Sequence, residues 1–242
     1  MNNLSFDMCE GEIFSLLGHN GAGKTTTINM LTGMFSPDAA SGNTTIYGHA
    51  IRDAMPRVRG LLGCCPQHDV LFESLTVREH IIFFALVKRA GTPGARLDDA
   101  EAEADELLAH FRLHERAAYV GAELSGGMRR KLSTAIALCG GSKFVVLDEP
   151  TAGMDPLARR ELWDLLRAMR AGRTMLLTTH YMDEASLSSR QCVSRKGSVL
   201  LCTQNDGRSH VAMCVSRTVV SDGRVRIIWS LDHPEVFFTT KM

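Results

Sequence analysis

The sequence lacks an excess of either charge, and it lacks a long hydrophobic run. Its 242 residues contain 27 lysines and arginines and 27 aspartates and glutamates, so the formal net charge is zero. This balance argues against a nucleic-acid partner, because nucleic-acid binding domains carry a basic excess. The longest apolar run, at 80–87, is far shorter than the roughly 18 residues that a membrane-spanning helix needs. The first residues also lack the basic and apolar pattern of a signal peptide.

The cysteines lack a metal-binding or disulfide pattern. There are 7 of them, an odd number without the spacing of metal ligands, and Cys64 and Cys65 are adjacent. This usage is typical of reduced thiols in a cytosolic protein. The length suits one large α/β domain or two small ones.

One glycine-rich stretch gives the strongest functional signal that is present. It fits G-x-x-x-x-G-K-[ST], the phosphate-binding loop, or Walker A motif, of nucleoside triphosphatases. Its residues are Gly18, His19, Asn20, Gly21, Ala22, Gly23, Lys24 and Thr25. The apolar run 13–17 predicts a buried strand before it, and residues 25–32 predict a helix that ends at Gly33. Strand, glycine loop and helix are the context that this motif requires.

The residue types of this loop explain its chemistry. Glycines let the backbone wind tightly, so that successive amide groups point at phosphate oxygens, and the helix N-terminus adds partial positive charge. Lys24 is placed to reach the β- and γ-phosphates, and the Thr25 hydroxyl is placed to bind Mg²⁺. The alternative is a glycine-rich turn before an ordinary amphipathic helix.

Elsewhere the chain alternates predicted strands with predicted helices. Further strands are predicted at 44–48, 61–65, 143–149 and 174–179, and helices at 76–88, 98–113, 128–139 and from 155 onward. The segment 76–79 predicts a capping box at the start of its helix, and an apolar stripe at helical spacing is predicted at Ala104, Leu107, Leu108 and Phe111. The residues before a turn at Glu10 and Gly11 are expected to be a short polar start. The alternation favours an α/β fold with a parallel sheet, whose site lies at the carboxyl edge of the strands.

Four polar residues follow predicted strands and are expected at that edge. Asp148 ends an apolar strand, where its carboxylate can hold Mg²⁺ together with Thr25. Glu149 can accept a proton from a water that attacks the γ-phosphate. His180 is placed to donate to that phosphate, and Gln67 to contact the metal or the water. For Asp148 and Glu149 alone, the alternative is a strand end that turns into solvent, and for His180 alone it is a surface histidine or a hydrogen-bonded core histidine.

A second glycine loop, Ser125, Gly126 and Gly127, precedes another predicted helix and can also bind an anion. One triphosphate does not need two such loops. Either this loop covers the nucleotide of another copy or partner domain, or it only caps its helix.

The order of these elements resembles the nucleotide-binding domain of ATP-binding cassette (ABC) transporters. The match includes the phosphate loop, Gln67, residues 124–128, the Asp148–Glu149 strand, residues 152–155 and His180. Residues 65–68, 126–133 and 179–185 further resemble subfamily A, the lipid exporters. The resemblance implies a P-loop NTPase fold with a mainly parallel central sheet, a small antiparallel β part and a helical subdomain at about 68–140.

The same resemblance implies ligands, partners and a location. ATP would contact the phosphate loop residues 18–25, Thr26, Gln67, Ser125, Gly126, Gly127 and Asp155. Mg²⁺ would contact Thr25, Gln67 and Asp148. The catalytic residues would be Glu149 and His180. A second cassette would pair head to tail, with Asp155 at the interface. The segment from Gln67 to Glu79 would face transmembrane domains, at the cytoplasmic face of a membrane, within a larger integral membrane transporter.

The resemblance covers residues 4–187 and weakens at both ends. We expect an ABC-type domain at 1–202 and a divergent tail at 203–242. Family members carry an earlier strand, with an adenine-stacking aromatic, before the position of residue 1. Residues 188–196 are too polar for a buried strand, and the tail offers two short candidate strands, 225–229 and 236–238, or is unrelated to the family. The alternatives to a transporter domain are an ABC ATPase without a membrane domain, or a truncated, non-catalytic fragment.

Overall fold

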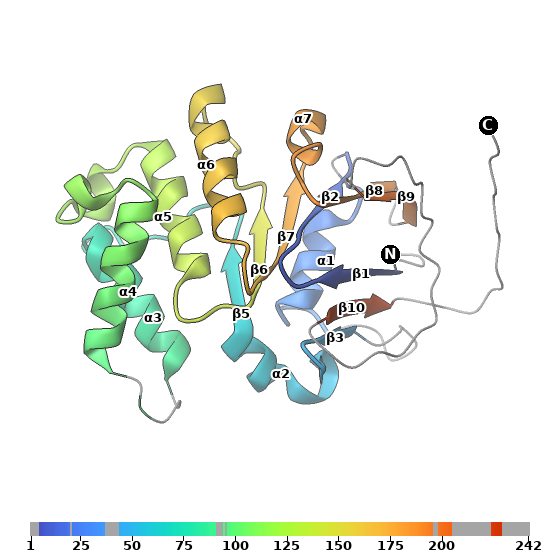
Figure 1. Ribbon diagram of the computed structural model, residues 1–242, viewed down its shortest axis with the longest axis horizontal. Coiled ribbons are helices and arrows are strands. Elements are labelled where there is room, and N and C mark those ends of the chain that lie inside the picture. The colour runs from blue at the N-terminus through green and yellow to red at the C-terminus, as the bar shows by residue number, and fades with distance from the viewer. Residues whose placement is uncertain are drawn as a thin grey trace.

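A computed structural model places most of the chain and gives the fold shown in Figure 1. It describes residues 5–19, 21–36, 44–90, 94, 96–195, 198–204 and 224–228. The strands are β1 (Ser5–Cys9), β2 (Ile13–Leu17), β3 (Thr44–Ile46), β4 (His49–Ala50), β5 (Leu62–Cys65), β6 (Phe144–Asp148), β7 (Thr174–Thr179), β8 (Arg190–Arg195), β9 (Ser198–Gln204) and β10 (Arg224–Ile228). The α-helices are α1 (Lys24–Leu31), α2 (Ile51–Leu61), α3 (Val77–Arg89), α4 (Leu97–His110), α5 (Gly126–Leu138), α6 (Pro156–Ala168) and α7 (Met182–Ala185).

The larger sheet has the strand order β5-β6-β7-β2-β8-β9. Every neighbouring pair from β5 to β8 is parallel, and only the pair β8 and β9 is antiparallel. The smaller sheet is antiparallel, with the order β1-β10-β3-β4. In Figure 1, α3, α4 and α5 gather on one side of the large sheet, and the small sheet lies on the other. This arrangement confirms the predicted fold class.

Two hydrophobic cores cover the two faces of the large sheet. Alternate residues of β6 point to opposite faces, so Phe144 and Val146 join one core while Val145 and Leu147 join the other. The core around Val145 and Leu147 includes α3, α4, α5 and α6, whereas the other includes α1, α2 and the small sheet. All five residues of β6 are buried, as expected of a parallel strand covered on both faces.

Two predictions about helices are confirmed. Thr76 and Glu79 form a reciprocal capping box at the start of α3. The predicted apolar stripe of α4 is buried in the core at Ala104, Leu107, Leu108 and Phe111. Cys64, Cys65 and Cys139 are free thiols, and burial raises the pKa of Cys64 to about 11 and that of Cys65 to about 12. No helix in the described part of the chain is both long and apolar enough to cross a membrane.

Two local expectations differ from the structure, and one helix carried no prediction. The polar start contains β1, because Phe6 and Met8 alternate with polar residues and bury their side chains under the small sheet. The polar segment 188–196 contains β8, which pairs in parallel with β2 despite its polarity. A helix, α2, also precedes β5; Pro56 lies within it, and its backbone kinks at Ala54.

The tail contributes β10 to the centre of the small sheet. This strand covers most of the candidate strand 225–229, whereas the candidate 236–238 lies outside the described residues. β10 pairs with β1 on one side and with β3 on the other, so Ile227 lies opposite both Phe6 and Thr44. In the described part of the chain, β10 is therefore the strand that joins β1 to β3 and β4. The division of the chain into domains at residue 202 stays a prediction.

A proline in β10 tests whether this strand holds the small sheet together. Ile227→Pro removes a backbone donor from a strand with two neighbours, and we expect the free energy of unfolding to fall by about 1–3 kcal/mol. Ile227→Val, which keeps the N–H group and the β-branched shape, should unfold close to the unchanged protein. Urea unfolding followed by circular dichroism measures both, and equal stability of the two variants would show that β10 contributes no hydrogen bonds to the sheet.

Candidate functional site

The candidate site lies where four neighbouring parallel strands end. The strands are β5, β6, β7 and β2, in that spatial order. Each leads into polar residues: Gln67 follows β5, Asp148 and Glu149 end β6, His180 follows β7, and the phosphate loop follows β2. Because the carboxyl ends of parallel strands share one edge, these residues converge as the sequence predicted. Their roles remain predictions.

The phosphate loop joins a buried strand to a helix N-terminus through left-handed glycines. All five residues of β2 are buried. Gly21 and Gly23 have φ angles of 81° and 92°, a region that only glycine enters without strain. Gly23 is the residue before α1, so the free amide groups of the first helical turn face the loop. The loop therefore combines converging N–H groups with the positive end of a helix, which suits an anion.

Lys24 is held inside this loop. Only 7% of the residue is exposed, and its Nζ donates a hydrogen bond of 2.6 Å to Gly18 O. A carboxylate oxygen of Glu149 lies 3.8 Å from the same nitrogen. Lys24 is thus a buried cation at the centre of the site, paired with one acid and one carbonyl. Asn20 of the same motif lies outside the described residues.

Asp148 and Thr25 meet across the end of the sheet. The Thr25 hydroxyl donates to Asp148 Oδ2 at 3.4 Å, and Asp148 is buried. The other oxygen, Oδ1, accepts a hydrogen bond from the Thr178 hydroxyl on β7. Hard oxygen ligands of this kind suit Mg²⁺, which binds through one or two protein oxygens and keeps several waters. The described residues hold no group of three or more histidine, cysteine or acidic side chains, so a metal here would rely on this small oxygen set.

Glu149 is the point at which the polar residues of the site meet. Its carboxylate lies 3.5 Å from both Gln67 Nε2 and His180 Nδ1 and 3.8 Å from Lys24 Nζ. Its backbone has a φ angle of 47°, and its N–H donates to Thr178 Oγ1 at 2.9 Å. A non-glycine residue in this region is strained, and such strain is often found at active sites. Gln67 and His180 therefore both approach Oε2 of one carboxylate, at the sheet edge where the sequence placed them.

The second glycine loop lies elsewhere. Ser125 is the N-cap of α5, and its Oγ accepts from Met128 N at 3.4 Å. In Figure 1, α5, which begins at Gly126, and α1, which begins at Lys24, lie on opposite sides of β6 and β7. Asp155 caps α6, and the N–H groups of Ala158 and Leu157 lower its pKa. The structure thus brings most predicted site residues together but leaves these on separate surfaces.

Two residues at the site carry no predicted role. Thr178 lies in the predicted strand 174–179, and its hydroxyl links Asp148 to the backbone of Glu149. Arg130 follows the second glycine loop and donates to the carbonyl oxygens of Asp148 and Glu149. A threonine inside an apolar strand gave a weak signal, since β-branched residues are common in strands.

Two aromatic residues, Phe6 and Phe14, precede the phosphate loop. Both are buried and their rings stack on each other, so Phe6 presents no exposed face to a ligand.

Comparison with known proteins agrees with this geometry. The sequence pattern of the family described as ABC transporter matches residues 1–152. The ATP-binding cassette sub-family A member 2 proteins of Rattus norvegicus and Homo sapiens are each 47% identical over 203 residues, which are 84% of this chain and 8% of theirs. The Phospholipid-transporting ATPase ABCA3 of Mus musculus is 47% identical over 203 residues, 84% of this chain and 12% of that protein. The chain spans only about a tenth of the length of these curated relatives.

Solved structures share the fold. The ATP binding subunit of an ABC transporter has a TM-score of 0.71 and 30% identity, and the similarity covers 83% of this chain and 81% of that one. A dimeric post-hydrolysis state of an ATP-binding cassette bound to ADP and Pi has a TM-score of 0.73 and 23% identity, covering 83% and 88% of the two chains.

Removing the Thr178 hydroxyl tests how the site is held together. Thr178→Val has nearly the same shape but removes the acceptor of the Glu149 N–H and the donor to Asp148 Oδ1, while the Thr25 contact to Oδ2 remains. We expect the free energy of unfolding to fall by about 1–3 kcal/mol, the typical result of leaving a buried polar group unpaired. Thr178→Ser keeps the hydroxyl and serves as the control. If chemical denaturation finds the valine variant as stable as the serine variant, the hydroxyl does not support the site.

Proposed function

The chain belongs to the ABC transporter family, and from this premise we propose that it binds and hydrolyses ATP to power transport across a membrane. The observation that carries the proposal is the convergence of Lys24, Asp148 and Glu149 at one edge of the sheet. A phosphate-binding cation, a metal-binding carboxylate and a base are the groups that phosphoryl transfer to water requires. Phosphate binding alone would not need the two acids.

Binding would depend on the phosphate loop. The amide groups at the start of α1 and the buried Lys24 would hold the β- and γ-phosphates, with Lys24 exchanging its present carbonyl and carboxylate partners for phosphate oxygens. Thr25 and Asp148, with Gln67, would hold Mg²⁺. When bound, Mg²⁺ neutralises charge on the β- and γ-phosphates. His19, Gly21, Ala22 and Thr26 belong to the same loop and helix start and would complete the contact.

Hydrolysis would depend on Glu149 and its two neighbours. The carboxylate would accept a proton from the attacking water. Gln67 and His180 both lie 3.5 Å from its Oε2 and would orient that water and the γ-phosphate. Because Thr178 and Arg130 hold the amide and the carbonyl of Glu149, the base would act from a fixed backbone position.

The second glycine loop supports a two-cassette arrangement. Ser125, Gly126 and Gly127 form the N-terminus of α5, a helix that lies across β6 and β7 from α1, the helix of the phosphate loop. We propose that they contact the nucleotide held by a second cassette, in a head-to-tail dimer, with Asp155 at the interface. Apart from its chain neighbours and the nearby backbone of α5, an added Cβ at Gly126 or Gly127 would meet no described atom within 4 Å, which leaves room for such a contact.

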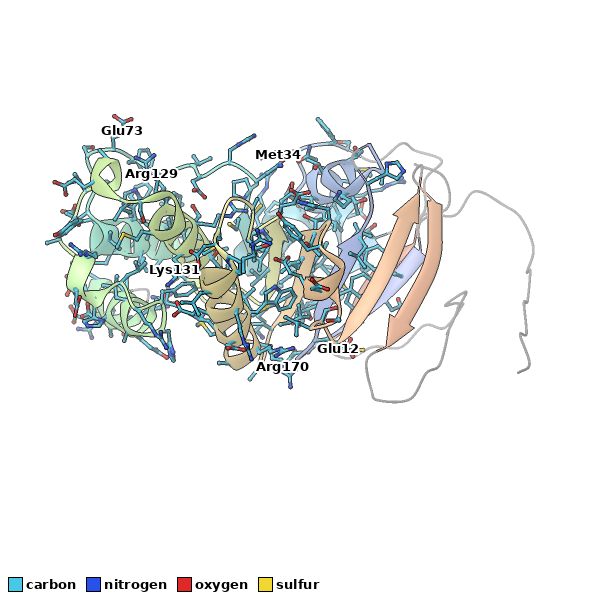
Figure 2. The ribbon with its side chains drawn as sticks, turned by 90° about the horizontal axis from the view of Figure 1, so that it is seen from above. Glu12, Met34, Glu73, Arg129, Lys131 and Arg170 are labelled. Atoms are coloured by element: carbon cyan, nitrogen blue, oxygen red, sulfur yellow. The ribbon has the colours of Figure 1, made fainter. Side chains whose placement is uncertain are left out.

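An exposed apolar surface supports a membrane partner. Val70, Phe72 and Phe83 are exposed, and Phe72 packs edge-on against Phe83 at 5.7 Å. Met34 is also exposed, and it lies with Glu73 along one side of the molecule in Figure 2. We propose that this side contacts the transmembrane domains, which would hold the chain at the cytoplasmic face of the membrane. Because relatives carry the name phospholipid-transporting, the proposed cargo is lipid.

Exchanging the base separates binding from hydrolysis. Glu149→Gln keeps the shape and the amide contacts but cannot accept the proton, so we expect ATP hydrolysis to slow by about 100-fold or more. ATP affinity should stay within about threefold, because the phosphate loop is unchanged. Lys24→Ala is the matched comparison and should weaken binding. Phosphate release and fluorescent-nucleotide titration measure the two quantities; turnover at the unchanged rate in Glu149→Gln would refute the assignment.

A further inference from the structure

Arg130 is a buried cation that none of the proposed binding or hydrolysis steps uses. It lies on α5, in the second glycine-loop motif, and only 3% of it is exposed. A guanidinium buried this deeply needs partners for its charge and for its N–H groups, because it has lost its water. Its five N–H groups make five hydrogen bonds.

The acceptors come from two loops of the site. They are Pro150 O at 2.9 Å from Nε, Pro66 O at 2.6 Å and Asp69 Oδ1 at 3.1 Å from Nη1, and Asp148 O at 2.6 Å and Glu149 O at 2.9 Å from Nη2. Two of these belong to the loop after β5, and three belong to the last residue of β6 and the turn that follows it. Gln67 immediately follows Pro66, so one planar group links the loop of Gln67 to the turn of Glu149.

This contact also accounts for the strained backbone of Glu149. Three successive carbonyl groups, from Asp148 to Pro150, point at the same guanidinium. Glu149, in the middle of the three, has a φ angle of 47°. A strained conformation persists only where its surroundings hold it, and here Arg130 holds the carbonyl while Thr178 holds the amide.

We propose that Arg130 is a positioning residue for hydrolysis, which sets the distance between the Gln67 loop and the Glu149 carboxylate. It touches neither side chain and would act through the backbone of both segments. The inference rests on the proposed function, since it assigns Arg130 to the step in which Glu149 is the base. Arg130 also connects the second glycine loop to the phosphate-loop site of the same chain, because α5 begins at Gly126 and carries Arg130.

A double-mutant cycle tests the proposal with the full chain. Arg130→Lys keeps the positive charge but replaces the planar five-donor fork by a point charge with three donors. We expect single-turnover MgATP hydrolysis to fall about 10- to 100-fold, as for a small misplacement of a catalytic group. ATP affinity should stay within about threefold, because Lys24 and the phosphate loop do not contact Arg130. Arg89→Lys, at a partly buried arginine paired with Glu103, is the control and should hydrolyse ATP at the unchanged rate.

The decisive comparison is the same change in the Glu149→Gln background. If Arg130 acts by positioning Glu149, Arg130→Lys should lower the residual rate by less than about twofold there. An equal fall in both backgrounds, or a matching loss of ATP affinity, overturns the positioning role and leaves the proposed function standing. Failure of the unchanged chain to hydrolyse MgATP, or a normal rate in Glu149→Gln, overturns the proposed function instead.

A milder variant keeps the test valid if Arg130→Lys does not fold. Asp69→Ala removes only the charged acceptor on the Gln67 side and leaves the four carbonyl contacts of Arg130 in place. We expect a several-fold fall in the hydrolysis rate that disappears in a Gln67→Ala background. Persistence of the full effect without Gln67 contradicts the proposed link between the two loops.

Discussion

The parallel pairing of β5, β6, β7 and β2 is the constraint on which the rest of the structure depends. It aligns Cys65 with Leu147, Asp148 with Thr178, and Leu17 with Thr179, so that the residues after each strand emerge at one edge. Both faces of these strands are covered by apolar cores, and a slip of one residue would exchange the two faces. Burial therefore fixes the register, and the register brings Lys24, Asp148 and Glu149 within reach of one another.

The sequence allowed the fold class and most of the candidate site to be predicted, because both depend on local patterns. Apolar runs that end in Asp148, His180 or the glycine loop predict buried strands and the residues at their ends, and this local pattern does not depend on which strands pair. The capping box of Thr76 and Glu79 and the left-handed Gly33 at the end of α1 were predictable for the same reason.

The features that could not be predicted depend on contacts between distant segments. β8 is polar and forms because β2 offers a free edge, and β10 lies between two strands from the other end of the chain. Arg130 looks like one more arginine of a solvated helix until the loops after β5 and β6 are seen to close around it. Neither pairing partners nor buried acceptors leave a periodic signal in the sequence.

We propose that two copies pair head to tail, so that each nucleotide contacts the phosphate loop of one copy and the second glycine loop of the other. The mass of the Glu149→Gln protein in solution shows whether this dimer forms. This variant should retain ATP, so a sandwiched dimer would persist long enough to be observed. Light scattering during size-exclusion chromatography, with and without MgATP, measures the mass. The account predicts the 26.6 kDa chain alone and twice that mass with MgATP. A monomer in both conditions would contradict it.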